Sequence, residues 1–374
     1  MSHTKEDLKE LQSKSLEEKI QISMGRIIEW YEHWDGKVYI SNSGGVDSTV
    51  LSDLVHRTYP DVPDVYCDTG LEYPELRDFI MSKPNVIVLK PALYDRKMKI
   101  WHHVSFAKVI EKYGYPIISK EQAAFIQEYR TAKSERLKQI RLNGNKYNRG
   151  KISKKWLKFI EPSCYIPVSD KCCDIMKKNP SKRFEHETGL HPYIGTMTDE
   201  SAQRESNWLK FGCNAFDKDR PTSNPLSFWT KSDVLHYIVK YNIPYVKEIY
   251  GDIVEKGGTY TTTKQKRTGC IFCGFGCHLE KEPNKFQILA TINPQLYDYC
   301  MRGGKYDELT SMWIPDKGLG MAKVLDYINI KWWNDGDETK RDEYRAKYKE
   351  KEEIEQSRKK SSQTDGASSK ICTY

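Results

Sequence analysis

The chain has 374 residues, of which 38% are hydrophobic and 30% charged, and its formal net charge is +8 at pH 7. This length allows one large or two ordinary domains with a proper core. No apolar run approaches the roughly 20 residues of a membrane span, and the polar N-terminus is unlike a signal peptide, so we expect a cytoplasmic protein with no membrane partner. The ten cysteines should then be mostly reduced, and clusters of them indicate metal or redox chemistry.

Strand and helix patterns alternate along the first part of the chain. A helix is expected over residues 8–34, with an apolar stripe that includes Leu16, Ile20, Ile27 and Trp30. Strands are expected at residues 38–40, 65–68, 86–89 and 193–196, and helices at 50–55, 74–81 and 231–241. This order predicts an α/β fold with a doubly wound parallel sheet, whose ligand binds at the carboxyl ends of the strands.

A glycine-rich turn connects the first strand to the following helix. Residues 41–49 are Ser-Asn-Ser-Gly-Gly-Val-Asp-Ser-Thr. Such a turn collects backbone N–H groups at the positive end of the helix dipole, which suits a phosphate, and Asp47 can hold Mg²⁺. The alternative is a turn with no ligand. The motif resembles the PP-loop of the adenine nucleotide alpha-hydrolases, which bind ATP and release its pyrophosphate. The residues placed at the nucleotide are Ser41, Ser43, Gly44, Gly45, Val46, Asp47 and Ser48.

Three further segments extend this resemblance. Residues 68–75 are Asp-Thr-Gly-Leu-Glu-Tyr-Pro-Glu, residues 195–197 are Gly-Thr-Met, and residues 224–230 are Asn-Pro-Leu-Ser-Phe-Trp-Thr. Together they resemble the phosphoadenosine phosphosulfate (PAPS) reductase family over roughly residues 37–280. The resemblance places five more residues beside the nucleotide: Asp68, Thr69, Gly70, Gly195 and Thr196. It also implies that Arg204 contacts a phosphate or sulfonate in catalysis, with a surface ion pair to Glu200 or Glu205 as the alternative.

Cysteines form two separated groups. Cys172 and Cys173 are adjacent, and Cys270, Cys273 and Cys277 follow about a hundred residues later. A Cys-x-x-Cys loop lets two thiolates reach one metal centre. The arrangement resembles the four-iron four-sulfur (4Fe-4S) site of the adenylylsulfate (APS) reductases, which implies the first four of these cysteines as ligands, with Cys277 as a rival. A zinc site or ordinary thiols are the alternatives. The isolated residues Cys67, Cys164, Cys213 and Cys300 are expected to be ordinary core or surface residues.

A strongly basic segment interrupts the α/β pattern. Between Arg130 and Lys158 there are eleven Lys or Arg residues and one acidic residue, Glu135. We expect a helical insertion, about residues 120–165, whose residues 130–158 offer a surface to a tRNA or DNA acceptor, with Tyr147, Trp156 and Phe159 stacking on bases. The alternative is a solvated face. The aromatic and histidine residues 101–103 are expected to lie on a structural helix, and Trp332-Trp333 to be a packing element.

Two departures separate the chain from true sulfonucleotide reductases. It lacks their C-terminal Glu-Cys-Gly-x-His segment, so that Cys372 is the candidate nucleophile for such a reaction, although a chance surface cysteine is the alternative. It also retains the whole loop from Ser43 to Ser48, including Asp47, which makes sense if Mg²⁺ and pyrophosphate are involved.

Three functions are therefore compatible with the sequence. The first is an ATP-dependent activation that gives AMP and pyrophosphate and is coupled to sulfur transfer onto a nucleic-acid acceptor, with an iron–sulfur cluster and a sulfur donor. The second is a PAPS or APS reductase that releases sulfite and uses a thioredoxin-like reductant. The third is a regulator that binds a nucleotide or nucleic acid without turnover.

The expected domain organisation has four segments. Residues 1–35 form an N-terminal helix and residues 36–255 the nucleotide-binding domain. Residues 256–335 form a Cys-rich, cluster-binding and helical region. Residues 336–374 form a charged flexible tail.

Overall fold

The computed structural model describes residues 3–348. They form two compact units, the first from the chain up to Ala92 and from Met176 to Gly269, and the second from Leu93 to Ile175 and from Cys270 onward. Each unit combines one early and one late segment of the chain. The four-segment division expected from the sequence stays a prediction, and residues 349–374 of the expected tail, with Cys372, lie outside the described residues.

The first unit is built on a six-stranded sheet. Its order is β3-β2-β1-β7-β9-β8, and all neighbouring strands are parallel except β8 and β9. The strands are β1 (Val38–Ser41), β2 (Asp64–Cys67), β3 (Val86–Leu89), β7 (His191–Ile194), β8 (Asn214–Ala215) and β9 (Thr222–Ser223). Strands β2 and β3 extend the sheet on one side of β1, and β7, β9 and β8 extend it on the other side. This reversal is the topological switch point of a doubly wound fold, and the predicted fold class is confirmed.

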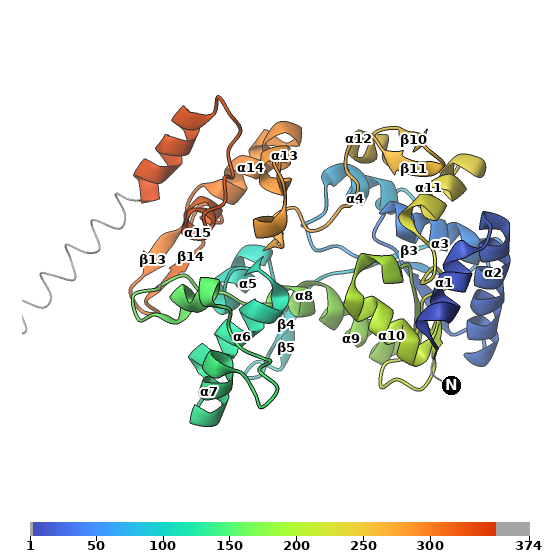
Figure 1. The fold of residues 1–374 in the computed structure, drawn as a ribbon, viewed down its shortest axis with the longest axis horizontal. Coiled ribbons are helices and arrows are strands. Elements are labelled where there is room, and N and C mark those ends of the chain that lie inside the picture. Colours follow the sequence, from blue (N-terminus) through green and yellow to red (C-terminus); the bar gives the residue numbers. More distant parts are fainter. Residues whose placement is uncertain (1–2, 349–374) are drawn as a thin grey trace, which may run out of the picture. The chain divides into compact units, whose positions relative to one another are not determined.

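Helices and a ribbon complete this unit (Figure 1). They are α1 (Lys5–Ser13), α2 (Leu16–His33), α3 (Val46–His56), α4 (Pro74–Met81), α9 (Asn179–Thr188), η3 (Thr198–Glu200), α10 (Ala202–Phe211), α11 (Lys231–Lys240), α12 (Lys247–Tyr250) and the hairpin β10 (Ile253–Lys256) with β11 (Thr259–Thr262). Helix α3 packs on β1 and on α11. Its buried side chains include Val50, Leu51, Leu54 and Val55, so α3 is held firmly behind the loop that precedes it.

The helical character expected over residues 8–34 is confirmed, but it is divided between α1 and α2 and is not one continuous helix. Ser15 caps α2, because its hydroxyl accepts a hydrogen bond from the Glu18 N–H while the Glu18 carboxylate accepts one from the Ser15 N–H. This reciprocal cap ends one helix and starts the next. The predicted apolar stripe of α2 is confirmed, since Leu16, Ile20, Ile27 and Trp30 are all buried.

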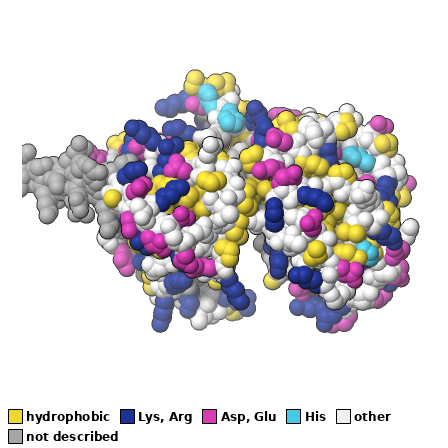
Figure 2. Space-filling view, turned by 90° about the horizontal axis from the view of Figure 1, so that it is seen from above, with side chains coloured by type: hydrophobic (Ala, Val, Ile, Leu, Met, Phe, Trp, Pro, Cys, Tyr) yellow, Lys and Arg dark blue, Asp and Glu magenta, His cyan; other side chains and the backbone are white. Residues whose placement is uncertain are grey.

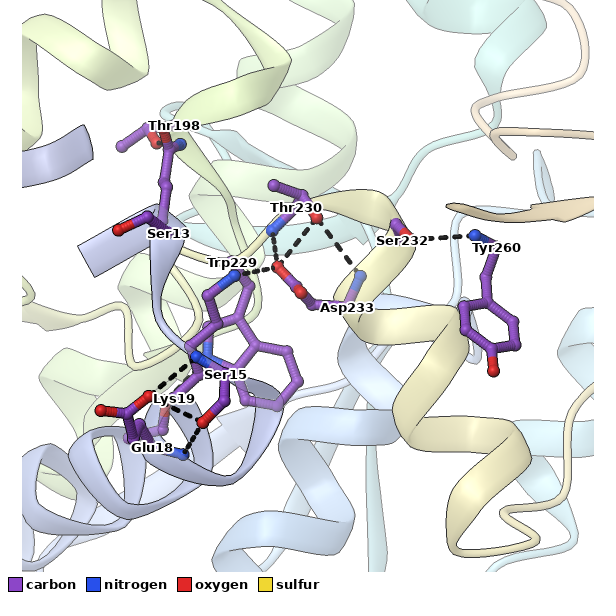
Figure 3. Close-up of polar contacts among 12 residues, drawn as sticks. Ser13, Ser15, Glu18, Lys19, Thr198, Trp229, Thr230, Ser232, Asp233 and Tyr260 are labelled. Atoms are coloured by element: carbon purple, nitrogen blue, oxygen red, sulfur yellow. Dashed lines mark hydrogen bonds and ion pairs between the residues drawn. The ribbon is translucent and has the colours of Figure 1, made fainter. Parts of the chain in front are cut away.

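Polar contacts attach α2 to the segment that begins α11 (Figure 3). The Lys19 ammonium lies 2.7 Å from a carboxylate oxygen of Asp233, and the same carboxylate accepts hydrogen bonds from the backbone and hydroxyl of Thr230. The Ser23 hydroxyl accepts a hydrogen bond from the Trp229 indole at 2.9 Å. These contacts fix the start of α11, and with it Lys231.

The second unit consists of short helices and two-stranded ribbons. Its helices are α5 (Phe106–Tyr113), α6 (Lys120–Thr131), α7 (Glu135–Asn143), η1 (Lys154–Ile160), α8 (Lys171–Cys173), η4 (Cys277–Leu279), α13 (Lys285–Ile292), α14 (Pro294–Met301) and α15 (Met321–Tyr327). Its strands pair as β4 (Ala92–Asp95) with β5 (Ile100–His103), β6 (Ile117–Ile118) with β12 (Gly274–Phe275), and β13 (Lys305–Asp307) with β14 (Met312–Ile314). A π-helical turn, η2 (Asp174–Lys178), continues α8 across the boundary between the units.

Of two expectations about this unit, one is wrong and the other is confirmed. Residues 101–103 lie in the exposed strand β5 and not on a helix, because Asp95 accepts hydrogen bonds from the N–H groups of Lys97 and Met98 and so closes a turn between β4 and β5. Trp332 is fully buried and donates a hydrogen bond from its indole to Asp326, which confirms a packing role. No helix among residues 3–348 has the length and apolar character to span a membrane.

Candidate functional site

Three loops of the first unit leave the carboxyl ends of parallel strands. They follow β1, β2 and β7, which are neighbours in the sheet. The loops contain residues 42–45, 68–73 and 195–197. Parallel strands place these loops at one edge of the sheet, where ligands of doubly wound folds bind.

The loop after β1 is shaped by contacts of its own backbone. Gly44 has φ +75°, and a Cβ at this position would meet the carbonyl oxygen of Leu76 at 2.8 Å, so only glycine fits. Its N–H donates to the side-chain oxygen of Asn42 at 2.9 Å, and the Ser43 N–H donates to the Ser48 hydroxyl at 3.2 Å. Gly45 is the N-cap of α3 and carries no side chain to cap it. The start of α3 is thus shaped to receive an anion.

Two hydroxyl groups stand beside Gly45. The hydroxyls of Tyr250 and Thr268 are hydrogen-bonded to each other at 2.8 Å, and both lie within 4 Å of the position of a Cβ on Gly45. Burial raises the pKa of Tyr250 to about 12, so its hydroxyl stays protonated at neutral pH and can donate a hydrogen bond. Sequence reasoning missed both residues, because each comes from a distant segment of the chain.

Asp47 lies in the first turn of α3 and forms an ion pair. One of its carboxylate oxygens is 2.7 Å from the ammonium of Lys231, the first residue of α11. Both side chains are about three-quarters buried. Gly195, in the loop after β7, packs against the same turn, since a Cβ there would meet the Asp47 carbonyl oxygen at 3.1 Å. The structure therefore brings Asp47 and Gly195 together, and adds Lys231, which sequence reasoning missed.

The loop after β2 is fixed by two charged contacts. The Asp68 carboxylate accepts two hydrogen bonds from the guanidinium of Arg77, at 3.0 and 3.2 Å, and these contacts raise the pKa of Arg77. The Thr69 hydroxyl donates to the carboxylate of Glu72, which also pairs with Lys177 at 3.1 Å. Asp68 and Thr69 are thus held in place at the sheet edge, while their contact with a nucleotide stays a prediction.

The loop after β7 borders a polar cavity. The Thr196 hydroxyl donates to the side-chain oxygen of Asn224 at 2.7 Å. Both residues line a cavity of about 170 Å³ together with Arg204 and Lys218. Burial lowers the pKa of Arg204, and nearby Arg267 adds to this effect. Two cations and several hydroxyl groups therefore face one small space.

Arg204 forms an ion pair with Glu200, and Arg267 pairs with the same carboxylate at 2.8 Å. The ion pair of Arg204 with Glu200, which the sequence offers as the alternative to a phosphate contact, is therefore present. A guanidinium held by one carboxylate still has N–H groups for an anion, so its role at a phosphate or sulfonate stays a prediction.

The second unit holds the cysteines. The Sγ atoms of Cys172 and Cys173 in α8 are 4.0 Å apart. The Cys172 thiol donates a hydrogen bond to Cys173. This bond and burial raise the pKa of Cys172, and its neighbours Cys173, Cys273 and Cys270 raise it further. The two groups, separated by about a hundred residues, are thus near enough to interact electrostatically, while their shared ligation of a metal stays a prediction.

The Cys-x-x-Cys turn is anchored by backbone contacts. The Cys273 N–H donates to the Cys270 carbonyl at 3.0 Å, and the next residue, Gly274, pairs with Ile117 in a parallel bridge. Burial raises the pKa of Cys273 and raises that of Cys277 to about 12. Buried thiols with raised pKa ionise only when a cation compensates the thiolate. Burial raises the pKa of the isolated Cys300 in the same way, so this rise does not by itself mark a metal ligand. Residues 3–348 contain no group of three or more His, Cys, Asp or Glu side chains that could hold a metal ion, so ligation by these cysteines stays a prediction.

The basic insertion differs from expectation in its aromatic residues. Trp156 and Phe159 are buried, where Trp156 packs edge-on against His278 and Phe159 against Tyr327. The expectation that these two rings stack on bases is therefore wrong, because η1 turns them into the core. Tyr147 is 68% exposed. On the face drawn in Figure 2, basic and acidic side chains are mixed.

Comparison with known proteins assigns the family. The phosphoadenosine phosphosulfate reductase domain model matches residues 37–113 and 118–265, more than half of the chain. The chain belongs to this family. The match includes the three loops and Cys172-Cys173 and ends before Cys270. The predicted PAPS reductase-like identity is confirmed.

Individual relatives are distant. An adenosine 5'-phosphosulfate reductase of Geobacillus kaustophilus is 25% identical over 224 residues, which cover 59% of this chain and 70% of that protein. A phosphoadenosine 5'-phosphosulfate reductase of Proteus mirabilis is 30% identical over 98 residues, 26% of this chain and 40% of that protein. The crystal structure of a PAPS reductase from Candida auris in a phosphate complex aligns with a TM-score of 0.32 at 15% identity, covering 66% of this chain and 91% of that one.

Proposed function

We propose that this PAPS reductase-family protein cleaves ATP to AMP and pyrophosphate and uses the activation for sulfur transfer onto a nucleic-acid acceptor. The observation that carries the proposal is the Asp47–Lys231 pair at the start of α3. The triphosphate would lie on the N-terminus of α3, between the loops after β1 and β7. The adenosine would lie along the loop after β2.

A carboxylate at a phosphate-binding turn repels the ligand unless a cation stands between them. Asp47 therefore has a function if Mg²⁺ accompanies the phosphates, because carboxylate and phosphate oxygens are the ligands that Mg²⁺ prefers. Lys231 then acts as a second positive charge. An acceptor oxygen, from the nucleic acid or from water when no nucleic acid is present, would attack the α-phosphorus as the bond to the bridging oxygen of the β-phosphate breaks. Pyrophosphate would leave, and Mg²⁺ and Lys231 would neutralise its charge. Attack by water would give AMP directly, whereas on the nucleic acid sulfide-level sulfur from the donor would then displace AMP.

The cysteines supply the second part of the proposal. Cys172, Cys173, Cys270 and Cys273 would hold a 4Fe-4S cluster, and Cys277 is the rival ligand. Such a cluster supplies electron transfer or a binding place for sulfur. Zinc is the alternative occupant.

The experiment uses anaerobically purified protein with Mg-ATP and measures pyrophosphate. We expect Asp47→Asn to lower the rate on the order of 100-fold, a loss typical of removing one electrostatic contact to the reacting group. The matched control is Asp61→Asn, since Asp61 is an exposed carboxylate of the same unit. Equal rates for the two variants would contradict the role of Asp47.

Metal content tests the cysteine site separately. We expect iron and acid-labile sulfide in the wild type, their loss in Cys273→Ser, and their retention in Cys164→Ser, a cysteine of the same unit that lies near the Ile166 carbonyl. Stoichiometric zinc without sulfide would establish the alternative occupant. Retention of iron and sulfide in Cys273→Ser would remove this residue from the ligand set.

A second candidate is a sulfonucleotide reductase. The names of the relatives from Geobacillus kaustophilus and Proteus mirabilis favour it. Cys372 would be the nucleophile, and a thioredoxin-like protein the reductant. Sulfite release from PAPS or APS that disappears in Cys372→Ser would establish this reaction. Binding of a nucleotide without pyrophosphate or sulfite would instead indicate a regulator.

A further inference from the structure

We propose that helix α7 and the loop that follows it bind an unpaired stretch of nucleic acid through its phosphates and one stacked base. The surface consists of Lys133, Arg136, Lys146, Arg149, Lys151 and Lys154, with Tyr147 among them, and is called the α7 surface below. The interpretation of the α7 surface as the site of the nucleic-acid acceptor rests on the proposed function. The binding itself is tested independently of nucleotide cleavage.

Several basic residues of the insertion have structural roles and are not part of this surface. The guanidinium of Arg130 donates to the carbonyls of Phe159, Cys164 and Ile166. Lys158 donates to the carbonyl of Tyr327. Arg141 pairs with Glu128 and lies over the Phe125 ring. Arg130 and Arg141 thus hold segments of the insertion together, and Lys158 attaches it to the end of α15.

The six cations of the α7 surface have a different environment. All six are exposed, and none of them forms an ion pair with a carboxylate in the described part of the chain. Glu135, the one carboxylate of the segment, is paired with Lys138 at 2.8 Å. The local positive charge is therefore uncompensated, which complements the charge of a phosphate backbone.

Helix α7 is unusual because it buries none of its residues. It lies beside α6 at the periphery of the second unit (Figure 1). A nine-residue helix is marginal without a buried face, so its position depends on polar anchors. Arg141 supplies them through Glu128 of α6 and through the Gly150 carbonyl at 2.6 Å.

The loop after α7 is ordered and returns to the helix. The Asn145 side-chain oxygen accepts hydrogen bonds from the N–H groups of Tyr147 and Arg149, at 2.9 and 3.0 Å. The Ile152 N–H then donates to the Arg141 carbonyl at 2.7 Å. This closed loop presents Lys146, Tyr147 and Arg149 on a fixed backbone close to α7, which lowers the entropy lost on binding.

Tyr147 gives the surface a preference for unpaired bases. Its ring is 68% exposed and lies 4.9 Å from the Lys146 ammonium. An exposed aromatic ring among cations is the arrangement that binds single strands, since each base has a face that can stack. A duplex hides these faces, so we expect a weaker interaction with duplex of the same length.

The test measures fluorescence anisotropy of labelled 20-nucleotide single-stranded DNA, single-stranded RNA and duplex DNA with the full chain. The variant Lys146→Ala/Arg149→Ala/Lys151→Ala should weaken single-strand binding at least about 10-fold and reduce the slope of log K against log salt by about 2, since each phosphate contact contributes about 0.7. Tyr147→Ala should weaken it about 5-fold or more. The two single strands show whether RNA or DNA is preferred.

The matched control is Lys9→Ala/Lys37→Ala/Lys256→Ala, which removes three exposed charges from the first unit. It should leave both the affinity and the slope nearly unchanged. Equal weakening by the two triple variants, or tighter binding of duplex than of single strands, would overturn the proposal. Pyrophosphate release from Mg-ATP without nucleic acid should be unaffected by either triple variant, so that failure of the proposed function is recognised separately.

Discussion

The buried ion pair between Lys19 and Asp233 permits a quantitative prediction for the first unit (Figure 3). The Lys19 side chain is 3% exposed and that of Asp233 18%, with the charged atoms 2.7 Å apart. Removing one partner of a buried pair leaves an uncompensated charge and destabilises by about 3–5 kcal/mol. Asp233→Asn leaves the buried ammonium and should reach this range.

Lys19→Met should destabilise less, below the range of about 3–5 kcal/mol expected for a fully buried unpaired charge. The remaining Asp233 carboxylate is partly exposed and keeps its hydrogen bonds from the N–H and hydroxyl of Thr230, at 2.7 and 2.8 Å, so that its charge stays partly satisfied. The double variant Lys19→Met/Asp233→Asn should be more stable than Asp233→Asn alone, since it leaves no buried charge without a partner.

The assay is urea unfolding followed by circular dichroism. The matched control is Lys5→Met, which removes a cation from the exposed pair with Glu205, where the Lys5 side chain is 67% exposed. This control should change the free energy of unfolding by less than about 1 kcal/mol. An effect of Asp233→Asn as small as that of Lys5→Met would show that the Lys19–Asp233 pair does not stabilise the first unit in this way.

Three further predictions concern the first unit. Gly44→Ala should abolish nucleotide binding in calorimetry while the protein stays folded, because a Cβ at φ +75° meets the Leu76 carbonyl at 2.8 Å; unchanged binding would contradict the loop geometry. Asn42→Ala should lower the free energy of unfolding by about 1–3 kcal/mol, since Asn42 links the Gly44 N–H to the buried carboxylate of Asp64; no change in urea unfolding would contradict this. Burial lowers the pKa of His191 below its usual 6.5, so the folded protein favours the neutral imidazole. The contribution of His191 to the free energy of unfolding is therefore complete above pH 6.5 and is lost as the pH falls. His191→Phe should flatten the dependence of this free energy on pH below 6.5, and an unchanged dependence would exclude His191 as its cause.

The sequence predicts those features that depend on neighbouring residues. The loop from Ser43 to Ser48 and the strands around it are local patterns, and the structure places them as expected. The break between α1 and α2 also has a local signal, because Ser15 and Glu18 stand at capping-box spacing. The apolar periodicity runs across this cap and hides it.

Features that depend on distant residues could not be predicted in this way. Lys231 reaches Asp47 across 184 positions of the chain, through the packing of α11 on α3. The burial of Trp156 and Phe159 depends on His278 and Tyr327, which no local pattern links to η1. Composition alone cannot distinguish an aromatic ring in a basic segment that faces the core from one that faces solvent.

The products formed from Mg-ATP distinguish an ATP-cleaving enzyme from a sulfonucleotide reductase. Anaerobic protein of known iron and sulfide content is incubated with Mg-ATP, or with PAPS or APS and thioredoxin, and pyrophosphate and sulfite are measured together. We expect pyrophosphate from ATP, with a rate that added single-stranded nucleic acid increases and that Asp47→Asn largely abolishes. Sulfite release without pyrophosphate would contradict this expectation and would identify the protein as a sulfonucleotide reductase.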